Sequence, residues 1–150
     1  MSKTQQIIDV ARKIAKKTRG FNIPKRQGEG NIATNRFMAK LRERVEHRLG
    51  FNYSEKRFSD DIDSKVDFYI PEEKTIIEIA LSLRNPSSEF HKDILKALLA
   101  KDNGWEVNRL VFVAKPDAEK NHDRPLSQKI KEWLEEHHSI TVEIEELPRQ

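Results

Sequence analysis

The sequence predicts an α/β domain in which helices flank a mixed central sheet. Apolar residues recur at helical spacing in four segments, which indicates amphipathic helices. Two runs rich in β-forming residues, 66–70 and 75–81, lie on either side of the turn-forming tetrapeptide PEEK, as in a hairpin. The nearly continuous apolar run 107–114 follows the next helix, which is typical of an interior parallel strand reached through a helical crossover.

The length and composition exclude several classes of protein. A chain of 150 residues suits one domain with a single core. The absence of cysteine excludes a disulfide-stapled module and a thiolate metal site. No apolar stretch approaches the roughly 20 residues that cross a bilayer, and the N-terminus lacks the apolar core of a signal peptide. We therefore expect a cytoplasmic protein without a membrane partner.

The first 30 residues are expected to form a basic N-terminal helix and arm, followed by the α/β domain over 31–150. Residues 4–18 place apolar side chains at helical spacing, and Gly20 ends this helix. The arm that follows contains one proline and two glycines. The basic side chains on the helix and arm are Arg12, Lys13, Lys16, Lys17, Lys25 and Arg26.

The remaining elements follow from apolar periodicity and from stop signals. A helix from about Asn31 or Thr34 to Leu49 ends at Gly50. After the hairpin, a serine-capped helix runs over about 89–101, and another helix covers 126–138. The alternation of apolar and polar residues over 140–147 predicts a final strand with one wet face.

The charge is strongly asymmetric along the chain. Residues 1–50 carry 13 basic and 4 acidic side chains, whereas residues 51–150 carry 15 basic and 21 acidic ones. The first third is therefore a candidate surface for a polyanion such as nucleic acid. The same charges could instead be the solvated faces of ordinary helices.

The hairpin places two carboxylates opposite each other. If the loop is Pro71–Lys74, paired residues have numbers that sum to 145, so Asp67 faces Glu78. A half-buried pair of acids needs a shared proton or a cation between its members, and Mg²⁺ favours one or two carboxylates with water and a phosphate. The alternative is that both acids are salt-bridged to Lys65, Arg84 or a helix lysine, or point into solvent.

These residues resemble the PD-(D/E)xK nuclease superfamily, which has the restriction-endonuclease-like fold. The resemblance covers about residues 34–114: Asp67, then Glu78 eleven positions later in an apolar strand, then the helix containing KDILKALLA and another apolar strand. It implies an αβββαβ-like core in which Asp67 and Glu78 bind Mg²⁺ or Mn²⁺. A Glu of the preceding helix often joins that metal site in the family, and Glu46, or else Glu43, could match it.

The sequence departs from the family pattern at the ExK lysine, whose position is occupied by Ala80. That lysine orients or deprotonates the attacking water and holds phosphate charge, which alanine cannot do. Two replacements are open: Lys65, directly opposite Ala80, or Lys92 and Lys96, one helical turn apart on the next helix. Ser82 and Arg84 are further candidates for phosphate contact.

The resemblance and the basic N-terminal region together imply a Mg²⁺-dependent endonuclease that hydrolyses DNA phosphodiester bonds, and by analogy a homodimer. We expect the DNA contacts to come from Arg12, Lys13, Lys16, Lys17, Lys25, Arg26 and Arg84. Because of Ala80, a catalytically inactive nuclease-fold protein that binds nucleic acid or serves as an assembly module remains open. A protein-interaction domain without a nucleic acid partner is a third possibility.

Overall fold

The computed structural model describes residues 1–18, 29–81, 86–118 and 124–149, which form two compact units. The first unit comprises Met1–Asn52 and Leu147–Gln150, and the second comprises Tyr53–Glu146. The helix that follows the arm thus belongs to the same unit as the N-terminal helix, whereas the sequence placed the boundary between residues 30 and 31.

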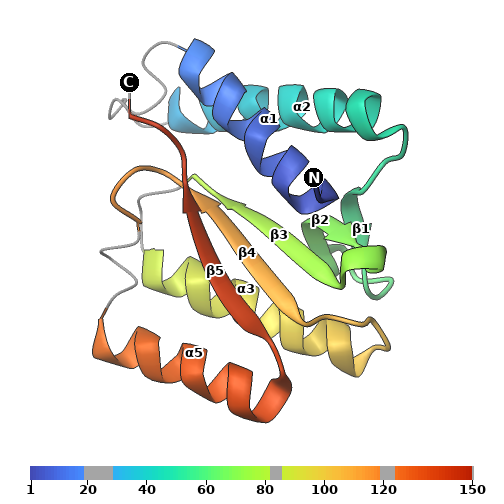
Figure 1. Cartoon of the computed structure of the whole chain (residues 1–150), viewed down its shortest axis with the longest axis vertical. Coiled ribbons are helices and arrows are strands. Elements are labelled where there is room, and N and C mark those ends of the chain that lie inside the picture. Colours follow the sequence, from blue (N-terminus) through green and yellow to red (C-terminus); the bar gives the residue numbers. More distant parts are fainter. Residues whose placement is uncertain (19–28, 82–85, 119–123, 150) are drawn as a thin grey trace. The chain divides into compact units, whose positions relative to one another are not determined.

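The first unit is built from two helices, α1 (Lys3–Lys17) and α2 (Glu29–Leu49), which lie side by side in Figure 1. The Ser2 hydroxyl accepts a hydrogen bond from the Gln5 backbone N–H at 3.0 Å and caps α1. After α2, Gly50 adopts a φ of +71°, a left-handed conformation that suits glycine at a helix end. The buried stripes of the two helices contain Ile7, Ile8, Ala11, Ile14, Ala15, Phe37, Leu41 and Val45.

The second unit contains a five-stranded mixed sheet with the strand order β1-β2-β3-β4-β5. Its strands are β1 (Ser54–Arg57), β2 (Lys65–Ile70), β3 (Thr75–Ala80), β4 (Arg109–Ala114) and β5 (Thr141–Glu146). Neighbouring strands are antiparallel from β1 to β3 and parallel from β3 to β5. The α/β class and the mixed sheet are therefore confirmed. The residue pattern did not locate the short edge strand β1, but the αβββαβ-like order implied by the resemblance includes a third strand before the crossover helix, and β1 occupies that place.

Two helices, α3 (Pro86–Asp102) and α5 (Pro125–His138), form the crossovers of the parallel part and cover one face of the sheet (Figure 1). Their buried side chains pack with those of β3 and β4, and Phe90 contacts Phe112 with ring centroids 5.1 Å apart. The Lys101 ammonium donates to the His138 carbonyl and ties the two helices together. The side of α3 that faces the sheet therefore packs into the core formed by β3 and β4.

The hairpin has the register expected from its turn. Phe68 pairs with Ile77 and Ile70 with Thr75, so the sum of 145 holds along the β2–β3 ladder. A short 3₁₀ turn at Pro71–Glu73 makes the loop, and Lys74 closes it in a left-handed conformation with a φ of 51°. This register determines which side chains of the two strands can meet under α3.

Candidate active site

Asp67 and Glu78 come together where the β2–β3 ladder ends. The paired register stops at Phe68, and the next pair in the same register is Asp67 with Glu78. There the Asp67 side chain takes over the role of the backbone, because its Oδ2 accepts a hydrogen bond from the Ile79 N–H at 2.7 Å. This bond holds the Asp67 carboxylate against β3, next to Glu78.

Glu78 is a buried carboxyl with an unsatisfied oxygen. The residue is 4% exposed, and within the described part of the chain its Oε1 has no hydrogen-bond partner. Burial raises the pKa of Glu78 well above its ordinary value, and the charges of Asp67 and Asp93 raise it further. A buried oxygen of this kind is costly unless something occupies the space beside it.

The Lys96 side chain enters this space from α3. Its Nζ lies 3.4 Å from Glu78 Oε1 and 3.4 Å from Asp93 Oδ1, and it donates a hydrogen bond to the Lys65 carbonyl at 3.1 Å. Burial lowers the pKa of Lys96, but the charges of Glu78 and Asp93 outweigh that effect, so its pKa is raised overall. The ammonium is therefore a fixed positive charge among the carboxylates.

Asp93 is a member of this site that the sequence reasoning did not single out. It lies one turn before Lys96 on α3 and is 8% exposed. Burial raises its pKa from 3.8 to about 6, although Lys96 opposes the shift. The spacing of three residues from Lys96 on the polar side of the helix was the available signal. Asp67, Glu78, Asp93 and Lys96 are called the carboxylate cluster below.

The other predicted site residues lie elsewhere or outside the described residues. The Lys65 ammonium pairs with Glu55 at 3.2 Å, so this side chain is engaged at the β1 edge of the sheet. Lys92 is exposed on α3, and Glu43 and Glu46 are exposed on α2 of the first unit. The structure thus brings Lys96, of the three candidate lysines, into contact with Glu78. The residues outside the described ranges are Lys25, Arg26, Ser82 and Arg84.

The donor atoms present suit a hard divalent ion with few protein ligands. Among the described residues, no group of three or more His, Asp and Glu side chains is arranged to hold a metal ion. Asp67 and Glu78 offer two carboxylates, and Oε1 of Glu78 has no hydrogen bond, although the Lys96 ammonium lies 3.4 Å from it. Mg²⁺ commonly takes one or two carboxylates and completes its shell with water and substrate phosphate, so this pair fits it.

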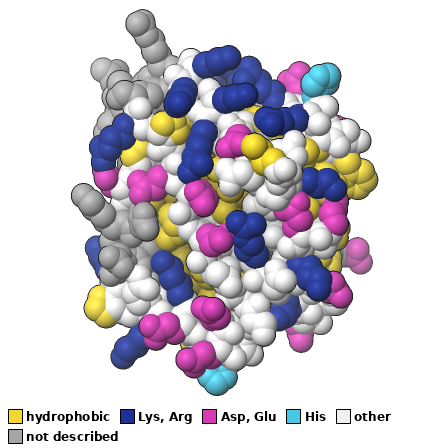
Figure 2. All heavy atoms as spheres, viewed as in Figure 1, with side chains coloured by type: hydrophobic (Ala, Val, Ile, Leu, Met, Phe, Trp, Pro, Cys, Tyr) yellow, Lys and Arg dark blue, Asp and Glu magenta, His cyan; other side chains and the backbone are white. Residues whose placement is uncertain are grey.

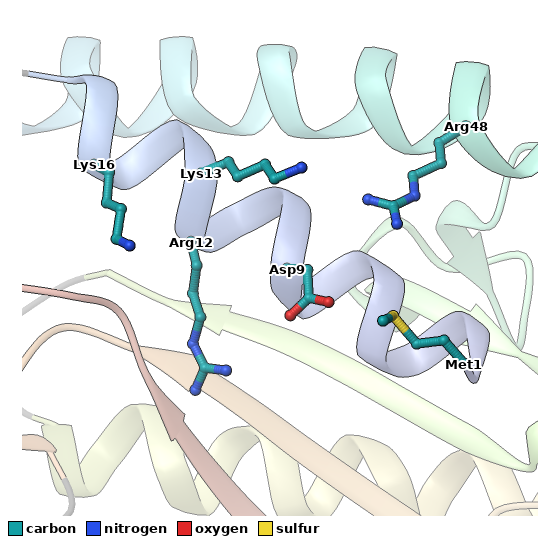
Figure 3. A pocket seen from close by; sticks show the side chains of 6 residues that line it. All are labelled: Met1, Asp9, Arg12, Lys13, Lys16 and Arg48. Carbon is teal, nitrogen blue, oxygen red and sulfur yellow. The ribbon is translucent and has the colours of Figure 1, made fainter.

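A second feature, the basic hollow, lies within the first unit. Figure 3 shows side chains of α1 and α2 around a hollow of about 390 Å³. Lys13 and Arg48 extend into the space between the two helices, and Asp9 is the one acid among the described residues that line the hollow. Figure 2 shows Lys and Arg side chains gathered over these helices. The lining residues are Met1, Asp9, Arg12, Lys13, Lys16 and Arg48.

The raised pKa of Asp93 predicts a pH-dependent loss of stability. Because the folded-state pKa of about 6 exceeds the ordinary 3.8, the folded chain binds this proton more tightly than the unfolded chain. The resulting stabilisation is present below about pH 4 and is lost as the pH rises to about 6, by at most about 3 kcal/mol. The asparagine of Asp93→Asn cannot titrate. The free energy of unfolding of this variant, compared with that of the native protein, should therefore rise between about pH 4 and pH 6.

Urea unfolding at a series of pH values measures this difference. The matched control is Asp60→Asn, which changes an exposed acid of the second unit. Parallel stability profiles for Asp93→Asn and the native protein would contradict the burial of Asp93 in the cluster.

No protein-family model, curated protein or solved structure matches the chain. None of the described helices is both long enough and apolar enough to span a bilayer. The chemistry of the cluster and of the basic hollow therefore carries the functional argument.

Proposed function

We propose that the protein is a metal-dependent endonuclease of the restriction-endonuclease-like fold that hydrolyses DNA phosphodiester bonds. The observation that carries this proposal is the placement of Asp67 beside Glu78, on two adjacent strands, with the Lys96 ammonium 3.4 Å from Glu78. Two acids and one fixed cation are the groups that the PD-(D/E)xK pattern requires, although the cation comes from α3 instead of the position of Ala80.

Asp67 and Glu78 are the proposed ligands of Mg²⁺ or Mn²⁺. A divalent ion held by them would polarise a phosphate oxygen and lower the pKa of a water molecule. The bond from Asp67 to the Ile79 N–H fixes one carboxylate, and the burial of Glu78 fixes the other. Pre-positioned ligands of this kind avoid the cost of ordering side chains when the ion binds.

Lys96 is proposed to replace the missing ExK lysine. Its raised pKa keeps the side chain protonated at neutral pH, so it is suited to hold the negative charge that develops on the phosphate. As an ammonium it cannot act as the base. Asp93 positions it through the contact at 3.4 Å. The reaction adds water across the phosphorus–oxygen bond, with the water oxygen joining phosphorus and the leaving oxygen taking up a proton.

The basic hollow and its surroundings are the proposed contact for the DNA backbone. Arg12, Lys13, Lys16 and Arg48 line it, and Lys17 is exposed on the same helix as Lys13. Each phosphate that these side chains neutralise releases condensed counterions, so binding should weaken steeply as salt rises. Arg48 was not among the residues expected to contact DNA, because its position on α2 gave no local signal that it lies near the N-terminal helix.

Cleavage of a supercoiled plasmid tests the proposal. We expect nicked or linear product with Mg²⁺ or Mn²⁺, none with chelator, and a loss of at least about 1000-fold for Asp67→Asn, because a metal ligand contributes several kcal/mol to the transition state. Asp60→Asn is the matched control and should retain activity. A folded native protein that cleaves no DNA with either metal would refute the nuclease proposal.

A catalytically inactive nucleic-acid-binding or assembly protein is the second candidate. The observations that favour it are Ala80 in the ExK position and the two ion-pair contacts of Lys96, which neutralise carboxylates without a metal. This candidate predicts salt-sensitive DNA binding, measured by fluorescence anisotropy, with no metal-dependent cleavage. Binding that does not change between low and high salt would exclude it as well.

A further inference from the structure

The outer face of α3 carries two exposed leucines in line with exposed charged residues. Leu95 and Leu99 are 59% and 51% exposed, whereas Ile94 and Ala97 are buried on the opposite face of the helix. Lys92 and Asp102 are also exposed and continue the same line. The four residues Lys92, Leu95, Leu99 and Asp102 are called the α3 stripe.

The α3 stripe has the spacing of a helix-pairing seam. Its members follow one another at intervals of three, four and three residues, which is the pattern that keeps one side of a helix facing a partner helix. A partner helix that covers two neighbouring exposed leucines removes their apolar surface from water, which favours association. The stripe is therefore suited to a second helix.

We propose that α3 pairs with α3 of a second copy of this chain, in antiparallel orientation, around a twofold axis near Ala97. Residues that face each other then have numbers that sum to 194. Leu95 lies opposite Leu99 of the second copy, and Lys92 lies opposite Asp102 of the second copy. Every contact occurs twice, as a twofold interface requires.

Charge complementarity selects the second copy and its orientation. In the antiparallel arrangement each Lys92 meets an Asp102, so two ion pairs flank the leucines. A parallel arrangement would place lysine against lysine and aspartate against aspartate, which is repulsive. In the antiparallel arrangement the two helix dipoles also point in opposite directions, which is favourable for helices that lie side by side.

The proposal of this dimer does not depend on whether the protein hydrolyses DNA. A single pair of helices buries less surface than a standard stable interface, so association should be weak, with a Kd of about 1 to 100 µM. If the nuclease proposal also holds, each copy would bring one carboxylate cluster to a double-stranded substrate.

Sedimentation equilibrium of the intact protein over a range of concentrations tests the interface. We expect reversible dimerisation of the native chain and monomers for the double variant Leu95→Glu with Leu99→Glu. Leu126→Glu is the matched control, because Leu126 is 63% exposed on α5 and lies outside the α3 stripe. Because all three leucines are exposed, we expect the variants to fold. Circular dichroism checks this.

Charge variants test the orientation. Lys92→Glu or Asp102→Lys alone should weaken the dimer at least tenfold, because each puts like charges opposite each other. The two changes combined should restore most of the native affinity. A native chain that stays monomeric at all concentrations, or single charge variants that dimerise as well as the native chain, would overturn the proposal.

Discussion

Lys96→Met should abolish metal-dependent cleavage and also destabilise the fold by about 2 to 3 kcal/mol at pH 8. The substitution keeps most of the apolar stem of the side chain but removes the ammonium that contacts both Glu78 and Asp93. Breaking a buried ion pair by removing one partner costs about 3 to 5 kcal/mol. The expected cost is lower here because both carboxyls have raised pKa values and can take up protons instead.

The pH dependence of the stability of Lys96→Met shows whether the stability is lost because the positive charge is removed. Below about pH 5 Asp93, whose pKa is about 6, is largely protonated, and the raised pKa of Glu78 also favours its neutral form, so the ammonium is needed less and the stability deficit of Lys96→Met should shrink. The control is Lys129→Met, which removes an exposed lysine of α5. A deficit that stayed constant with pH would show that Lys96 acts through packing of its alkyl chain instead of through its charge.

Glu78→Gln should stabilise the protein, unlike Lys96→Met, and should remove metal-dependent cleavage, as Lys96→Met does. Glu78 is buried, and burial together with the charges of Asp67 and Asp93 opposes its ionisation. A neutral amide of the same shape avoids this cost, so we expect a gain of about 1 to 2 kcal/mol at pH 8. Cleavage should fall at least about 1000-fold, because an amide is a poor ligand for a hard divalent ion.

The sign of the stability change distinguishes a functional carboxylate from a structural one. A residue retained for its ion pair would destabilise the protein when neutralised, whereas a residue retained for ligand binding at a cost to the fold would stabilise it. Glu135→Gln, an exposed substitution on α5, provides the matched control for guanidinium unfolding. A destabilised Glu78→Gln variant would mean that its pair with Lys96 outweighs its burial.

The hairpin and the crossover could be predicted because local signals determine them. The tetrapeptide between the two strands fixes the loop length, the loop fixes the register, and the register brings Asp67 and Glu78 together. The apolar run of β4 after a capped helix likewise predicted the parallel pair with β3. Periodicity located the helices, whose observed ends differ from the expected ends by a few residues.

The rest depended on tertiary contacts that no local pattern encodes. Lys65 and the helix pair Lys92 and Lys96 were alternative replacements for the ExK lysine, the helix pair being the more familiar in the family. The choice of Lys96 follows from its contact with Glu78, whereas Lys65 pairs with Glu55 on β1. Asp93 resembled an ordinary surface acid until α3 packed on the sheet. Arg48 joins the basic hollow only because α2 lies beside α1.

A crystal structure of the protein soaked with Mn²⁺ tests the central claim most directly. The account predicts an anomalous peak about 2.1 Å from one oxygen each of Asp67 and Glu78, with the Lys96 ammonium nearby. It also predicts that the peak disappears in Glu78→Gln. A map without a peak at these carboxylates, in which Lys96 still pairs with Glu78, would contradict the metal-dependent site.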